Sequence, residues 1–157
     1  MNKVAENLVA LLKAQGLTCA TAESCTGGGV GHAITAVAGS SAVFAGGVIS
    51  YANEVKRDVL GVSDHNLQTV GAVSGEVAAQ MAAGVKKLLG VDLAVSITGI
   101  AGPDGGSAEK PVGLVWFGLA SDGGVRTEKA IFRGDREAVR KAAIVHALGM
   151  LTVGAMA

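Results

Sequence analysis

Aromatic side chains are scarce in this sequence, which has one Trp, one Tyr and three Phe, 3% of the chain, beside 24 glycines. Half of the residues are apolar, so the core must be packed with small side chains that let backbones approach closely. Helices lying on a sheet suit that composition. With 157 residues, the chain has the length of one compact domain, and we predict a single domain over residues 1–157.

An excess of either charge is also absent. Thirteen Lys and Arg balance 13 Asp and Glu, with no basic run, so the electrostatic footprint of a nucleic-acid-binding protein is missing. No unbroken apolar run approaches the length of a membrane span, and the first residues lack the pattern of a secretory signal. We expect a soluble, cytoplasmic protein with no nucleic-acid or membrane partner. The high apolar content predicts a homodimer or higher homo-oligomer.

Cysteine and histidine are few and scattered. Cys19 and Cys25 are expected to be reduced thiols in the cytosol. The three histidines lie outside the segments that form the candidate site below, and no HxH, HExxH or CxxC spacing occurs. The sequence therefore predicts no metal and no cofactor.

The periodicity of apolar residues predicts alternating helices and strands. Helices are predicted over 3–15, from about 30 to 37, over 53–60 with Asn53 as N-cap, after a cap at Asp64, from Ser74 to Gly90, and from Asp135 to about 153. Strands are predicted over 17–23, 43–51, 91–98, 114–120 and 125–132, with the last two joined as a hairpin. These elements predict an α/β fold, a three-layer α/β/α sandwich with a mixed sheet of about five strands.

Three segments follow predicted strands and carry the residues most suited to chemistry. They are residues 23–29, 51–56 and the Gly- and Pro-rich loop 98–107. In open α/β sheets, ligands bind beyond the carboxyl ends of the strands, where the following helices present free N–H groups. If the three ends converge, a serine, a tyrosine, a lysine and a loop of backbone donors share one site.

Lys56 is predicted in the first turn of its helix, with Arg57 beside it. Both the helix dipole and the Arg57 charge disfavour the ammonium form and lower the pKa of Lys56. A neutral lysine can act as a general base. The alternative is an ordinary surface lysine.

Ser24 lies at a predicted strand-to-helix junction in the stretch TAESCTGGGVG, residues 21–31. There its hydroxyl can be exposed, backbone N–H groups of residues 25–28 can face a developing oxyanion, and the glycines admit a substrate. Lys56 would accept the Ser24 proton. Two alternatives stay open: Ser24 only caps the helix, or Cys25 is the nucleophile, because a helix N-terminus lowers a thiol pKa.

Arg136 and Arg140 are one turn apart on the last predicted helix, so together they could hold a phosphate group. A solvated helix face is the alternative. The TGGG run could likewise cradle a phosphate, although it lacks the lysine of a P-loop.

Five blocks of sequence together resemble the CinA C-terminal domain family, the nicotinamide-mononucleotide deamidases. They are AESCTGG from Ala22, ISYANEVK ending at Lys56, TGIAGPDGG from Thr98, KPVGLVW from Lys110 and GDREAVRKAA from Gly134. The blocks occur in order and the resemblance extends from about residue 4 to the last helix. It implies metal-free hydrolysis of the carboxamide of nicotinamide mononucleotide to nicotinate mononucleotide and ammonia, in pyridine nucleotide salvage.

The resemblance also implies roles for individual residues. Ser24 matches the nucleophile, Lys56 its base, and Tyr51 the tyrosine of the same block. Substrate binding is expected at Glu23, Cys25, Thr26, Gly27, Gly28, Thr98, Gly99, Gly102 and Arg140. Many family members carry a further molybdopterin-binding-like domain, and we expect a stand-alone deamidase here. The alternative function is a non-catalytic nucleotide-binding or regulatory domain.

Overall fold

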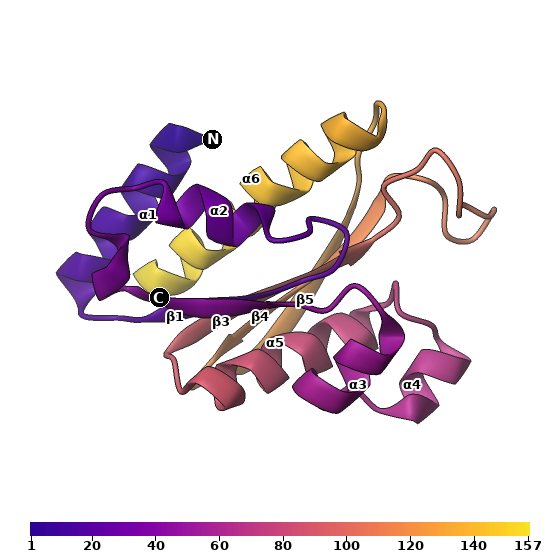
Figure 1. The fold of residues 1–157 in the computed structure, drawn as a ribbon, viewed down its shortest axis with the longest axis horizontal. Helices are drawn as coiled ribbons and strands as arrows, with labels where there is room; N and C mark the ends of the chain where they lie inside the picture. The colour runs from indigo at the N-terminus through magenta and orange to yellow at the C-terminus, as the bar shows by residue number, and fades with distance from the viewer.

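A computed structural model describes all residues of the chain, Met1–Ala157, and shows a five-stranded sheet between two layers of helices (Figure 1). The strands are β1 (Cys19–Glu23), β2 (Phe44–Ile49), β3 (Leu93–Gly99), β4 (Leu114–Ser121) and β5 (Gly124–Ile131). The helices are α1 (Asn2–Gln15), α2 (Gly29–Thr35), α3 (Asn53–Leu60), α4 (Asp64–Thr69), α5 (Gly75–Leu89) and α6 (Arg136–Met156), with a 3-10 turn, η1, at Ser40–Ala42. Helices α1, α2 and α6 lie on one face and α3, α4 and α5 on the other. The predicted three-layer fold is confirmed.

The sheet is mixed, with strand order β2-β1-β3-β4-β5. Strand β1 runs parallel to both of its neighbours, whereas β3, β4 and β5 pair antiparallel. The last residue of β1, Glu23, is in register with Ile49 of β2 and Ile97 of β3. Because parallel strands end at the same edge of a sheet, the register brings the three candidate segments together at one edge.

Two apolar clusters fill the spaces between the layers. The larger has 25 buried residues and joins α1, α2 and α6 to the sheet, with Phe117 as its buried ring. The smaller has 11 and lies beneath α5, with Leu60 of α3 among its members. The smaller cluster consists almost entirely of Ala, Val and Leu, so helices α3 and α5 can approach each other closely.

Most predicted helix ends are confirmed by their caps. Gly16 and Gly90 end α1 and α5 in the left-handed conformation, at φ 66° and 64°. The Ser74 hydroxyl accepts from Val77 N at 3.3 Å, and the Asp135 carboxylate accepts from Ala138 N at 2.9 Å.

Two predicted caps are wrong by one residue. The N-cap of α3 is Ala52, whose extended backbone precedes the helix, so Asn53 is the first helical residue. The N-cap of α4 is Ser63, because its hydroxyl rather than the Asp64 carboxylate accepts from Asn66 N, at 3.1 Å. In both helices the residue predicted as the N-cap is instead the first helical residue.

Helix α6 contains charged residues and no unbroken apolar run of membrane-spanning length, but its average composition is strongly apolar. By length and composition alone it is apolar enough to cross a membrane, with 21 residues and a mean hydropathy of 1.3 over 18 of them. In the structure it packs as a core helix against α1 and the sheet, with Val139, Ala143, Leu148 and Leu151 buried. A helix buried in a protein core has the same composition as a membrane span, and 44% of this window is buried.

The close approach of α3 and α5 gives a testable prediction. A methyl group at Gly84 of α5 would overlap the main-chain carbonyl oxygen of Leu60, whereas one at Gly149 of α6 would meet nothing within 4 Å. In an open helix position, Gly→Ala stabilises by about 0.5–1 kcal/mol. We expect Gly149→Ala to raise the free energy of unfolding and Gly84→Ala to lower it, measured by urea denaturation. A stabilised Gly84→Ala variant would contradict this packing.

Candidate active site

Ser24 is the first residue of a tight turn between β1 and α2. Its N–H donates to Ile97 O at 2.9 Å, and Gly27 N donates back to Ser24 O at 3.1 Å. Gly27 and Gly28 adopt φ values of 60° and 99°, which side-chain-bearing residues rarely take. The N-cap of α2 is Gly28, with no side-chain cap. Ser24 therefore does not cap the helix, and its hydroxyl is free for another partner.

That partner is the amine of Lys56. Lys56 is only 1% exposed, and its Nζ lies 3.1 Å from Ser24 Oγ, 2.7 Å from Ser50 O and 3.1 Å from Tyr51 O. A carbonyl oxygen can only accept a hydrogen bond. When the amine is neutral, the two carbonyls take its two N–H groups, and its lone pair is left to face the Ser24 hydroxyl.

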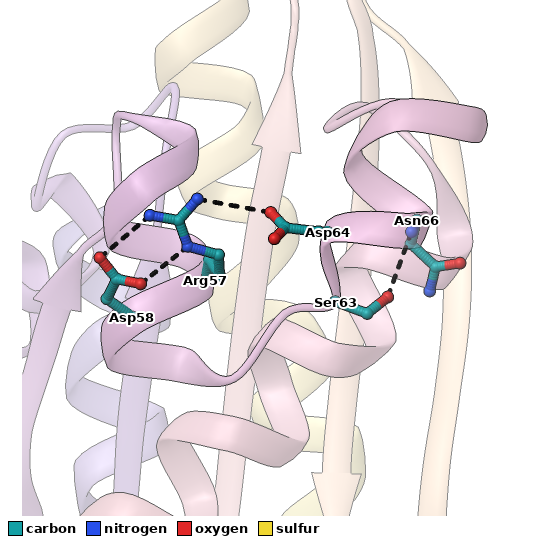
Figure 2. Close-up of polar contacts among 5 residues, drawn as sticks. All are labelled: Arg57, Asp58, Ser63, Asp64 and Asn66. Carbon is teal, nitrogen blue, oxygen red and sulfur yellow. Dashed lines mark hydrogen bonds and ion pairs between the residues drawn. The ribbon is translucent and has the colours of Figure 1, made fainter.

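Burial lowers the pKa of Lys56 below its ordinary value, because a charged amine is poorly stabilised away from water. The predicted contribution of Arg57 is wrong. The Arg57 guanidinium is exposed and bonds Asp58 at 2.8 Å and Asp64 at 3.4 Å, as Figure 2 shows. Its charge is thus balanced by two carboxylates, and desolvation is the cause of the Lys56 shift.

Glu23 holds the turn through hydrogen bonds to its side-chain carboxylate. Its carboxylate is 1% exposed and accepts from Thr26 Oγ1 at 2.7 Å, Val30 N at 2.9 Å and Gly31 N at 3.0 Å. It therefore supplies the N-terminal cap that α2 lacks from its own residues. Glu23 is a structural residue of the turn in this arrangement.

The two arginines of α6 have different partners. Arg140 donates from Nε to Cys25 O at 3.1 Å and from a terminal nitrogen to Thr26 O at 3.3 Å. Arg136 donates to Gly102 O at 2.8 Å and lies 3.5 Å from the Tyr51 hydroxyl. The two side chains therefore do not meet in a joint phosphate site: Arg140 holds the turn and Arg136 reaches the loop after β3.

A cavity of about 200 Å³ opens over the Ser24–Lys56 pair. Its lining residues are Ser24, Cys25, Tyr51, Asn53, Lys56, Ala72, Val73, Thr98, Gly99, Ala101 and Arg136. Six of them are among the predicted site residues: Ser24, Cys25, Tyr51, Lys56, Thr98 and Gly99. The remaining predicted residues, Glu23, Thr26, Gly27, Gly28, Gly102 and Arg140, lie around the cavity without lining it.

Comparison with known proteins identifies the family. Residues 1–153 match the CinA C-terminal domain. The chain belongs to the CinA C-terminal domain family. A protein of Enterobacter agglomerans named nicotinamide-nucleotide amidohydrolase PncC is 54% identical over 149 residues, which are 94% of this chain and 91% of that protein. A CinA-like protein of Geobacter is 53% identical over 86% of this chain but only 33% of its own length.

The fold agrees with solved structures of the same family. The crystal structure of a competence/damage-inducible protein from Agrobacterium tumefaciens superposes with a TM-score of 0.96 at 42% identity. The superposition covers 99% of this chain and 95% of that one. This CinA domain thus has the fold of its relatives over its whole length.

Some cavity residues gave no signal in the sequence. Ala72 and Val73 precede α5 and present backbone and small apolar groups, which no chemical motif marks. Asn53 stands in the same block as Tyr51 and Lys56 but was assigned to capping. A residue whose side chain caps a helix is not expected to line a cavity, so the wrong cap position left Asn53 out of the predicted site.

Cys25 is a poor nucleophile in this setting. The thiol is 5% exposed, and burial raises its pKa to about 11, outweighing its own backbone N–H and the nearby Arg140 charge. The prediction that the helix N-terminus lowers this pKa is therefore wrong. A thiol nucleophile acts as its thiolate, so Ser24 is the better candidate in this CinA domain.

The buried amine predicts how stability changes with pH. Because Lys56 titrates below 10.5 when folded, the unfolded chain binds more protons between the two pKa values, and stability rises with pH there by up to about 1.4 kcal/mol per unit. Lys56→Met lacks this dependence. We expect the unfolding free energy of the wild type, minus that of Lys56→Met, to grow as pH rises toward 10.5. A difference independent of pH would show that Lys56 is charged in the folded protein.

Proposed function

We propose that this chain is an amidohydrolase that converts nicotinamide mononucleotide to nicotinate mononucleotide and ammonia in pyridine nucleotide salvage. The relative from Enterobacter agglomerans that is named for this activity aligns with 94% of the chain, and one from Escherichia coli K12 with the same name aligns with 95% at 51% identity. The observation that carries the proposal is the 3.1 Å contact between Lys56 Nζ and Ser24 Oγ at the floor of the cavity.

In the first half of the reaction, the neutral Lys56 amine accepts the Ser24 proton as the oxygen attacks the carboxamide carbon. The resulting ammonium then donates that proton to the amide nitrogen as the carbon–nitrogen bond breaks. Ammonia leaves, and the nicotinoyl group remains as an ester of Ser24. Lys56 is again neutral after this step.

In the second half, water attacks the ester carbonyl while Lys56 accepts a proton from it. The ammonium returns that proton to Ser24 Oγ as the ester bond breaks, and the product leaves as the carboxylate after its acid proton passes to solvent. Each step uses the same short path between Nζ and Oγ, so one buried lysine serves as base and as acid.

The negative charge that develops on the carbonyl oxygen must be stabilised by a hydrogen-bond donor. The Cys25 N–H follows the nucleophile and makes no main-chain hydrogen bond. We assign it as an oxyanion donor. Arg140 fixes the carbonyl groups of Cys25 and Thr26, and it thereby positions the peptide groups of the turn.

Arg136 is the residue we assign to the substrate phosphate, because it is the one guanidinium that lines the cavity. Its bidentate geometry suits a phosphate group. Tyr51, with 64% of its surface exposed, lines the same cavity as Thr98 and Gly99, the last residues of β3. The other residues predicted to bind substrate act by shaping the turn and the loop.

The homodimer or higher homo-oligomer and the cytoplasmic location stay predictions and belong to this proposal. Both cysteines are free thiols, as is usual in a reducing compartment. Exposed apolar side chains at Val125 and Ile131 on the edge strand β5 support a subunit interface. Light scattering at micromolar protein distinguishes a dimer from a monomer.

The first test is ammonia release. Purified protein is expected to form ammonia and nicotinate mononucleotide in equal amounts, and Ser24→Ala is expected to lower kcat by several powers of ten with little change in substrate binding, because the hydroxyl acts in the chemical step. Cys25→Ala is the matched control in the neighbouring residue and should retain most activity. An inactive Cys25→Ala beside an active Ser24→Ala would reverse the assignment.

The second test concerns the base. Arginine keeps the positive charge of Lys56 but does not release a proton at accessible pH, so Lys56→Arg should be as inactive as Lys56→Ala. In the wild type, the acidic limb of kcat/KM against pH should lie below the ordinary lysine pKa of about 10.4, in line with the lowered pKa of Lys56. Robust activity of Lys56→Arg would leave Lys56 with a structural role only.

A further inference from the structure

A second cavity lies between α2 and the edge strand β2. It has a volume of about 190 Å³ and shares no residue with the cavity over Ser24 and Lys56. Its walls are Thr21, Glu23, Gly28, Gly31, Thr35, Phe44, Gly47, Val48 and Ile49, and we call it the α2–β2 cleft. A cavity of about 150 Å³ is enough to hold a benzene ring, so this cleft has room for one six-membered ring with a small substituent.

Glycines keep the α2–β2 cleft open. A methyl group at Gly31 would lie 3.3 Å from the Phe44 ring and 3.6 Å from Glu23 Oε2, directly in the cleft. One at Gly28 would lie 3.0 Å from Ile49 Cδ1. Any larger residue at these positions would occupy the space between the helix and the strand.

Thr21 presents an unpartnered hydroxyl to this space. The residue is 1% exposed, yet its hydroxyl makes no hydrogen bond to another protein group. No fully buried side-chain polar atom in the structure lacks a partner, so the Thr21 hydroxyl must be reachable from the cleft that it lines. The hydroxyl is therefore free to donate to, or accept a hydrogen bond from, a molecule that enters the cleft.

The Glu23 carboxylate gives the cleft its charge. Its Oε2 atom accepts a single hydrogen bond, from Gly31 N, which leaves acceptor capacity on that oxygen. None of the ion pairs of the protein includes Glu23. A buried carboxylate without a cationic partner favours a ligand that brings a positive charge.

We propose that the α2–β2 cleft binds a small planar cation, an aromatic amidine or amine one ring wide. The ring lies between the apolar side chains of Phe44 and Ile49, and its N–H groups donate to Glu23 Oε2 and Thr21 Oγ1. The neutral or anionic analogue of the same ring lacks this charge-assisted bond and binds more weakly.

Occupation of the cleft acts on the catalytic turn through Glu23. The same carboxylate holds Thr26, Val30 and Gly31, and Glu23 directly precedes Ser24. A cation that draws Oε2 toward the cleft weakens the bonds that fix the turn. We therefore expect a lower kcat with little change in KM, an effect that rests on the proposed function, whereas binding itself does not.

Benzamidine tests the site, by isothermal titration and by amide chemical shifts. We expect saturable binding, no binding of benzoate, and a two- to tenfold weaker affinity in Thr21→Val, which removes one hydrogen bond and keeps the side-chain shape. Gly31→Ala should abolish binding by filling the cleft, and it favours helix α2. Circular dichroism checks that both variants are folded. Lys56→Met, changed only in the other cavity, should bind as the wild type does.

Two results would overturn the site: no saturable binding of benzamidine at millimolar concentration, or binding that Lys56→Met removes and Thr21→Val and Gly31→Ala leave intact. Binding with an unchanged kcat would overturn the coupling to the turn and keep the site. A protein that binds benzamidine in the cleft but releases no ammonia from nicotinamide mononucleotide would reject the proposed function alone.

Discussion

The buried amine of Lys56 constrains the rest of this structure, because an ammonium removed from water costs several kcal/mol unless it is fully paired. Lys56 is among the largest side chains that the protein buries completely, and no carboxylate is hydrogen bonded to it. Two main-chain carbonyls and one hydroxyl surround Nζ instead. Ser50, which provides one of the carbonyls, also donates its N–H to Glu23 O at 2.8 Å. The pairing of β1 with β2 thus places both Ser24 and the groups that hold the Lys56 amine beside it.

The turn that carries Ser24 is fixed by two opposite charges. The Glu23 carboxylate accepts from N–H groups at the start of α2, and the Arg140 guanidinium donates to the carbonyls of Cys25 and Thr26. These bonds use polar groups of the turn other than the Ser24 hydroxyl, and they leave that hydroxyl facing Lys56. A turn built largely from glycine would otherwise lose much of its geometry to backbone freedom.

Sequence reasoning brought Ser24 and Lys56 together because each follows a strand, and parallel strands end at a common edge. It gave the wrong cause for the state of Lys56, since Arg57 is adjacent in sequence but turns toward Asp58 and Asp64. Burial by packing across the sheet cannot be seen in a local sequence window. The two arginines of α6 were indistinguishable for the same reason: their spacing shows that they share a helix face, not which loop each one meets.

Helix α6 connects the hydrophobic core to the site. Its apolar length lies in the core against α1 and the sheet, which fixes its axis, while its first two turns carry Arg136 and Arg140. Because they project one turn apart from a rigid helix, Arg140 reaches the turn after β1 and Arg136 reaches Gly102 and Tyr51. One helix therefore links all three loops of the site to the core. The composition of α6 follows from these two roles. Its first two turns, which meet the loops of the site, carry the arginines, and the rest of the helix, which packs in the core, is mostly apolar.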